Sequence, residues 1–120
     1  MRNKKSNKIL GRNSQQRSHL MKNLTSSLLE HGSIVTTEAK AKELRRYFEP
    51  LVTKAKGELT LANRRRLVSS LMMETDLPVL LAVAKKHAKR EGGYLRVTKL
   101  PINRTDAASM ARVDIVGQEA

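Results

Sequence analysis

The 120-residue chain contains no cysteine and no tryptophan, and its aromatic residues are Tyr47, Phe48 and Tyr94. Without cysteine neither a disulfide nor a thiolate metal site can form, which suits a reducing compartment. So few aromatic rings offer almost no platform for unpaired bases, each of which would gain roughly 1–3 kcal/mol from stacking. Any bound nucleic acid would therefore be held mainly through its phosphates.

Long apolar runs are also missing. The best apolar run, residues 77–84, is far shorter than the roughly 20 residues that span a bilayer, so we predict no membrane partner. Lys8 and Arg12 bracket only three residues near the start, which leaves no room for the apolar region of a secretory signal. An acid-free start with Arg and Ser is also typical of an organellar transit peptide, and that alternative stays open.

Acidic residues are absent before Glu30, whereas the whole chain has 24 Lys and Arg against 11 Asp and Glu, a formal net charge of +13. A segment that repels itself needs a partner that supplies negative charge. Residues 1–13 have no periodicity, so we predict an extended arm; simple disorder is the alternative. Its cations alternate with Asn, Ser and Gln, which suit contacts with phosphates and ribose hydroxyls. The RNA contacts predicted in this region are Arg2, Asn3, Lys4, Lys5, Lys8, Arg12, Asn13, Arg17 and Lys22.

Four later segments have apolar residues at steps of three and four, which is typical of helices. We predict the first from the capping residue Ser14 to the stop at Gly32, and the second from a cap at Thr36 or Thr37 to Gly57. Pro50 should kink the second helix without breaking it. The third runs from Thr60 to about Met73, and the fourth from a cap at Asp76 to the stop at Gly92-Gly93, with Lys85, Lys86, Lys89 and Arg90 in its last turn.

Three β-branched or alternating stretches predict strands: SIVTT (33–37), YLRVTKL before Pro101, and ARVDIV (111–116). The last two are joined by a long hairpin loop. The predicted fold is α+β, with about four helices packed on a small three-stranded antiparallel sheet and an extended basic N-terminal arm. We predict an arm at 1–13, a single globular domain at 14–116 and a short tail at 117–120.

Catalysis is poorly supported, because the acids are scattered and no acid–base pair converges on one pocket. His19, His31 and His87 lack the spacing of metal ligands. We expect His31 to be half-buried at a helix end and His87 to lie on the surface. We therefore predict no enzyme, no cofactor, no metal and no small-molecule substrate.

Two basic clusters have a structural alternative. Arg64 falls on the apolar arc of its helix, so an internal ion pair is as good an interpretation as RNA contact. The cations of 85–90 could match the dipole at a helix end or bind phosphate, with equal support.

Several motifs resemble the bacterial-type large-subunit ribosomal protein L17 family. They are RNKK and LGRNS near the start, HGSIVTTEAKAKELR (31–45), EPLVTKAK (49–56), LANRRR (61–66), GGYLRV (92–97) and DAASMARVDIV (106–116). The resemblance begins at Met1, which favours the arm over a transit peptide. It implies RNA contacts by the arm and, further along, by Arg45, Arg65, Tyr94 and Arg96.

The resemblance further implies a structural, non-enzymatic protein that binds large-subunit rRNA near the peptide tunnel exit, among other ribosomal proteins. It implies a cytoplasmic place in the ribosome, bacterial rather than mitochondrial or plastid, although those two stay open. The first alternative is a basic DNA-binding nucleoid or regulatory protein, which would need a recognition helix that the sequence does not display. The second is an enzyme acting on RNA.

Overall fold

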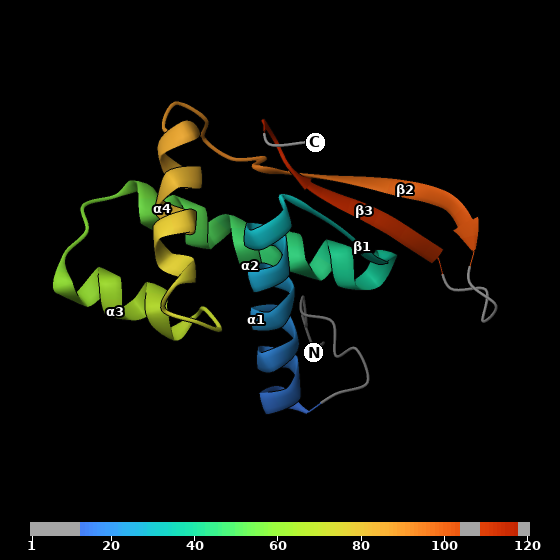
Figure 1. The fold of residues 1–120 in the computed structure, drawn as a ribbon, viewed down its shortest axis with the longest axis horizontal. Coiled ribbons are helices and arrows are strands. Elements are labelled where there is room, and N and C mark those ends of the chain that lie inside the picture. Colours follow the sequence, from blue (N-terminus) through green and yellow to red (C-terminus); the bar gives the residue numbers. More distant parts are fainter. Residues whose placement is uncertain (1–12, 104–108, 118–120) are drawn as a thin grey trace, which may run out of the picture.

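Four helices pack on a three-stranded antiparallel sheet in a computed structural model of the chain, which describes residues 13–103 and 109–117 (Figure 1). This confirms the predicted α+β fold. The predicted arm, apart from Asn13, and the tail beyond Gly117 lie outside the described residues, so the division into arm, domain and tail stays a prediction.

Helix α1 (Ser14–His31) begins one residue earlier than its predicted cap implies. Its cap is Asn13, whose side chain accepts a hydrogen bond from the backbone N–H of Gln16 at 2.8 Å, while Gln16 Oε1 accepts from the Asn13 N–H at 3.2 Å. This reciprocal capping box satisfies two backbone donors. Gly32 ends the helix as predicted, in the left-handed conformation at φ 79° that favours glycine.

Strand β1 (Ser33–Thr37) leads directly into helix α2 (Glu38–Lys56), and both match the prediction. Thr37 caps α2 by accepting from the Lys40 N–H at 3.4 Å. The helix continues unbroken through Pro50 because its apolar stripe stays in phase on both sides. That stripe is fully buried and consists of Ala41, Leu44, Phe48, Leu51, Val52 and Ala55.

The sheet has the order β1-β3-β2, with β2 spanning Leu95–Asn103 and β3 spanning Ser109–Ile115. Val113 of β3 lies between Ile34 of β1 and Val97 of β2, and this row of apolar side chains faces the helices. Ala111 and Ile115 lie on the same face, because side chains alternate along a strand. Helix α2 crosses this face and contacts all three strands, and α1 contacts β1 and β3. Strand β2 runs on through Pro101, where the prediction ended it. An edge strand tolerates proline because no ladder partner needs its N–H.

Helices α3 (Leu61–Ser69) and α4 (Asp76–Lys86) lie away from the sheet, against α2 (Figure 1). Helix α3 stops short of the predicted Met73. The Ser69 and Ser70 hydroxyls donate to the Arg66 carbonyl at 2.7 and 3.2 Å and so compete with the helical hydrogen bonds there. Leu61, the first residue of α3, is 64% exposed.

Helix α4 differs from the prediction at both ends. Asp76 is not its cap: Thr75 precedes the helix without a side-chain cap, and Asp76 is buried in the first turn. At the other end the helix stops at Lys86, six residues before Gly92, so Lys89 and Arg90 lie beyond it. His87 Nδ1 lies 3.0 Å from the Val83 carbonyl and Nε2 lies 2.7 Å from that of Val116 after β3. The chain turns here because the histidine is tied to the sheet.

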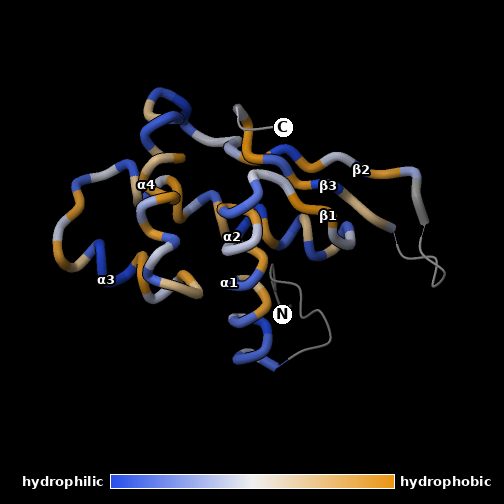
Figure 2. The backbone as a smooth tube through the Cα atoms, viewed as in Figure 1, coloured by the Kyte–Doolittle hydropathy of each residue, from blue (hydrophilic) through white to orange (hydrophobic). Residues whose placement is uncertain are grey.

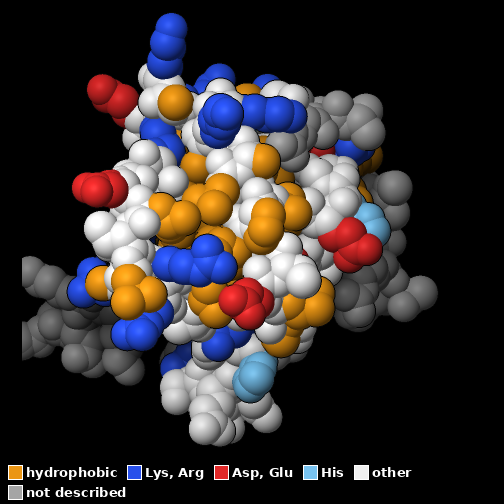
Figure 3. Space-filling view, turned by 60° about the vertical axis from the view of Figure 1, so that its left-hand side comes forward, with side chains coloured by type: hydrophobic (Ala, Val, Ile, Leu, Met, Phe, Trp, Pro, Cys, Tyr) orange, Lys and Arg blue, Asp and Glu red, His pale blue; other side chains and the backbone are white. Residues whose placement is uncertain are grey.

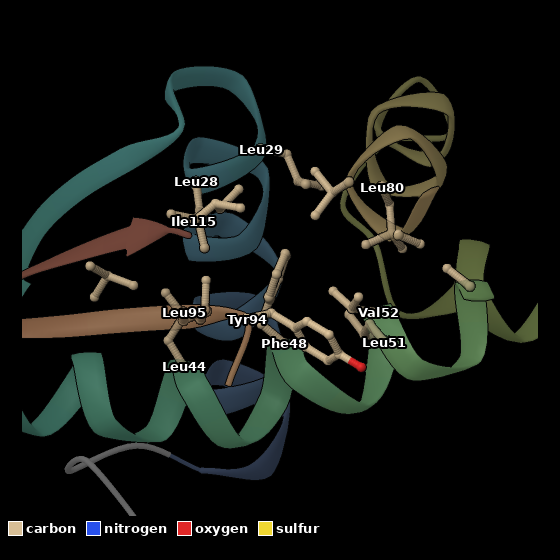
Figure 4. Close-up of a cluster of buried hydrophobic side chains, with 14 of the residues drawn as sticks. Leu28, Leu29, Leu44, Phe48, Leu51, Val52, Leu80, Tyr94, Leu95 and Ile115 are labelled. Carbon is tan, nitrogen blue, oxygen red and sulfur yellow. The ribbon is translucent and has the colours of Figure 1, made fainter. Parts of the chain in front are cut away.

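The core forms where α1 and α2 meet the inner face of the sheet, and it continues between these helices and α4 (Figure 4). Hydrophobic and hydrophilic residues alternate along these elements (Figure 2), which lets each of them bury one face. The two histidine predictions are wrong. His31 is exposed at the end of α1, whereas His87 is 6% exposed and packs edge-on against Tyr94, with ring centroids 5.7 Å apart.

Candidate nucleic-acid interface

The predicted contacts that the structure describes begin on α1. Asn13 is exposed, but its side chain is engaged in the helix cap. Arg17 and Lys22 are half-buried and five residues apart, which places them about 140° apart around the helix. They therefore do not share one face. Arg2, Asn3, Lys4, Lys5, Lys8 and Arg12 lie outside the described residues.

The predicted contacts beyond α1 are spread over three elements. Arg45 is exposed on α2, with Nε 3.6 Å from Glu49 Oε2. Arg65 is exposed on α3 and Arg96 is exposed on β2, where it is opposite Asp114 in the ladder. Helix α3 and strand β2 lie at opposite ends of the molecule (Figure 1). The structure therefore does not gather these residues into one patch.

Tyr94 is placed in the core, at 1% exposure, and we no longer include it among the RNA contacts. Its hydroxyl accepts from Lys56 Nζ at 2.8 Å and donates to the Arg90 carbonyl at 3.1 Å. The hydrogen bond from Lys56 is the main cause that lowers the pKa of Tyr94, and one with Thr53 adds to it. Tyr94 is thus a structural residue that ties α2 to the turn after α4.

A groove of about 580 Å³ lies beside Arg45, between α2 and the segment that leads into β2. Its wall carries cations and acids together. Three cations (Arg45, Arg46, Lys54) and two acids (Glu49, Glu91) line it with Pro50, Thr53, Gly92 and Tyr94. This mixture makes the groove less favourable for a polyanion than a purely cationic surface.

The arginines of α3 are all exposed, which settles the question left open for Arg64. Its Nη2 lies 3.9 Å from Glu74 Oε1, so the ion pair exists, but at the surface, with side chains 49% and 73% exposed. Exposed ion pairs of this kind contribute little to stability. Arg64 is therefore accessible to a partner.

The run 85–90, one of the clusters left undecided, lines a cationic hollow. A cavity of about 610 Å³ lies at the C-terminal end of α4, lined by Lys86, His87, Lys89, Arg90, Val116 and Gly117. Figure 3 shows Lys and Arg side chains gathered along the upper end of the molecule, where α4 ends. In the sequence this cavity is indicated by the run KKHAKR (85–90). Val116 and Gly117, which follow β3 and also line the cavity, cannot be predicted from that run.

Other kinds of site find no support in the part of the chain that the structure describes. There, no three His, Asp or Glu side chains are grouped so that they could hold a metal ion. Among the same residues, no helix combines the length and apolar character needed to cross a membrane.

Fold and surface together define a small basic α+β protein. The family model described as Ribosomal protein L17 matches residues 20–116. The large ribosomal subunit protein bL17 of Sphingopyxis alaskensis is 44% identical over 120 residues, covering 99% of this chain and 86% of that protein. The bL17 protein of Desulforapulum autotrophicum is 42% identical over 122 residues, covering 99% of both chains. The chain belongs to the ribosomal protein L17 family, which confirms the resemblance.

Proposed function

We propose that this protein is a structural constituent of the large ribosomal subunit that binds and stabilises large-subunit rRNA through its basic arm and surface. The relatives at 42–44% identity are named large ribosomal subunit proteins and come from bacteria. A cytoplasmic location in the ribosome follows from that family membership. The partners are large-subunit rRNA and neighbouring ribosomal proteins.

The observation that carries the RNA partner is the distribution of charge. Glu38, Glu43 and Glu49 of α2 each have a basic partner within 4.0 Å, so the acids of that helix balance three of its six cations. The first 29 residues contain no acid at all. Ordering an arm costs roughly 1–2 kcal/mol per residue in backbone entropy. Phosphate contacts and the release of counterions can offset that cost, which neutral partners could not do.

A position near the peptide tunnel exit is supported by the family resemblance. The exposed apolar side chains of Leu61 (64%) and Met73 (52%) suit contacts with neighbouring proteins. We propose no catalytic role, because ribosomal proteins of this family are structural and Glu38, Glu49 and Glu74 are paired with Lys or Arg at the surface.

Deleting residues 1–12 tests the arm. The cut must leave Asn13, because Asn13 caps α1 and its loss would destabilise the domain. The deletion removes five cations. At roughly 0.7–0.9 per phosphate contact, the slope of log affinity for rRNA against log salt should fall by about 4. The matched control replaces the same five cations with Gln in the full-length chain and should behave alike.

An unchanged slope in the deleted protein would refute RNA binding by the arm. Competition between structured rRNA and duplex DNA at equal salt tests the alternative partner. Preference for DNA would favour the nucleoid or regulatory protein instead.

A further inference from the structure

The cations of the described domain fall into two groups. On α2, Lys42 Nζ lies 3.5 Å from Glu38 and Arg45 lies near Glu49, so these charges are balanced. Within the described residues, the side chains of Lys85, Lys86, Lys89 and Arg90 have no ion pair with an acid. Lys22, Lys40, Lys54, Lys56, Arg65 and Arg66 also have no ion pair with an acid among the described residues, but the four cations at the end of α4 lie within six consecutive positions.

These cations surround the cavity of about 610 Å³ between the end of α4 and the end of β3. We call it the α4-end pocket and define it by Lys86, His87, Lys89, Arg90, Val116 and Gly117. No Asp or Glu is among these described lining residues. Glu91, the next residue along the chain, lines the neighbouring groove with Arg45 instead. The α4-end pocket thus presents one sign of charge to an incoming ligand.

The frame of this pocket is held by hydrogen bonds between α4, the turn after it, α2 and the end of β3. The His87 ring lies between α4 and the end of β3, with Nδ1 3.0 Å from the Val83 carbonyl oxygen and Nε2 2.7 Å from the Val116 carbonyl oxygen; a neutral imidazole donates a hydrogen bond to one of the two. The Arg90 carbonyl accepts from the Tyr94 hydroxyl and from Lys56 Nζ, which joins the turn to α2. Because the backbone is already fixed, less ordering entropy is lost when the cations engage a ligand.

The helix dipole explains only part of this arrangement. Lys85 and Lys86 lie in the last turn of α4, where cations are favourable. Lys89 and Arg90 lie beyond the end of the helix, and the dipole's influence falls off within the last turn. Their position against the pocket has a better explanation in a bound anion, since ammonium and guanidinium groups donate strong charge-assisted hydrogen bonds to phosphate oxygens.

We propose that the α4-end pocket binds a phosphate group of the rRNA backbone, as a contact separate from the arm. This inference rests on the proposed function. The pocket adds a rigid anchor on the folded domain to the contacts made by the arm. Backbone phosphate contacts fix position and orientation on RNA without reading its sequence.

The test compares two double variants of the full chain that each remove two positive charges. Lys86→Gln/Lys89→Gln removes two cations of the pocket. Lys42→Gln/Lys99→Gln removes two cations that both pair with Glu38, at 3.5 and 3.9 Å. Affinity for transcribed large-subunit rRNA is measured over a range of salt. We expect the pocket variant to lower the salt slope by about 2, roughly 1 per lysine, and the control to leave it nearly unchanged.

All four lysines are exposed, so both variants should keep the circular dichroism spectrum and melting temperature of the parent chain. An equal loss of slope in the two variants would mean a general charge effect and would overturn the pocket. An unchanged slope in the pocket variant, with rRNA still bound, would overturn the pocket alone. Failure of the parent chain to bind rRNA would overturn the proposed function and this inference together.

Inorganic phosphate at constant ionic strength separates the two possible sources of the anion. Amide resonances of 86–90 and 116–117 should shift on addition of rRNA. If they shift with inorganic phosphate but not with rRNA, the pocket is a site for free phosphate and the inference is wrong.

Discussion

Replacing His87 with Phe should destabilise the protein, although the ring keeps its size and its edge-on contact with Tyr94. The substitution removes both ring nitrogens. The Val83 carbonyl still accepts the His87 backbone N–H at 3.2 Å, so it stays paired. The Val116 carbonyl loses the ring nitrogen at 2.7 Å. An acceptor left without its partner costs about 1–3 kcal/mol, and we expect about 2 kcal/mol in all.

Thermal and urea unfolding measure this loss. For a chain of this length, about 2 kcal/mol corresponds to a fall in melting temperature of roughly 8 °C. The matched control is His31→Phe, because the His31 side chain is 62% exposed and should change stability by less than about 0.5 kcal/mol. Equal stability of His87→Phe and the parent chain would refute the structural role of His87. So would a larger loss at His31 than at His87.

The two tyrosines should titrate on opposite sides of pH 10.0, their ordinary pKa. The hydrogen bond from Lys56 lowers the pKa of Tyr94, whereas burial raises that of Tyr47. Tyrosinate absorbance of Tyr47→Phe and Tyr94→Phe separates the two curves, since the chain has no tryptophan; reversed or coincident curves would contradict this assignment. The sign for stability follows from linkage. Between the lowered pKa of Tyr94 and pH 10.0, this residue binds fewer protons in the folded chain than in the unfolded chain. Its contribution to the free energy of unfolding therefore grows as the pH rises. Above pH 10.0, Tyr47 binds more protons in the folded chain than in the unfolded chain, so its contribution to the free energy of unfolding falls as the pH rises. Urea unfolding of each variant over this pH range measures both trends.

Local patterns predicted most of the fold because the signals were strong where burial is one-sided. The stripe from Ala41 to Ala55 gave α2 its length and buried face, and the alternation of ARVDIV gave β3. The errors lie where distant groups decide. Helix α4 ends early because His87 reaches Val116, 29 residues away, and no local pattern contains that contact. The burial of His87 was misjudged for the same reason.

The candidate site was less predictable than the fold. The family resemblance implied Tyr94 as an RNA contact, but its side chain is buried through contacts with Lys56 and α2, which lie far away in the sequence. The run at 85–90 was left undecided because a helix end and a phosphate site use the same cations. Because α4 ends early, Lys85 and Lys86 lie in its last turn whereas Lys89 and Arg90 lie beyond it, which supports the proposed phosphate contact. RNA contact by residues 1–12 of the arm stays a prediction that is based on charge.

Directed cleavage of rRNA tests most directly the central claim that the unopposed cations of the arm meet large-subunit RNA. Because the chain has no cysteine, Ser6→Cys creates a single thiol to which an iron chelate that generates hydroxyl radicals can be attached. The labelled protein is assembled into large ribosomal subunits. Discrete cleavage of large-subunit rRNA around position 6 is the result we predict. Assembled subunits that show no cleavage above the level of the untethered reagent would contradict it.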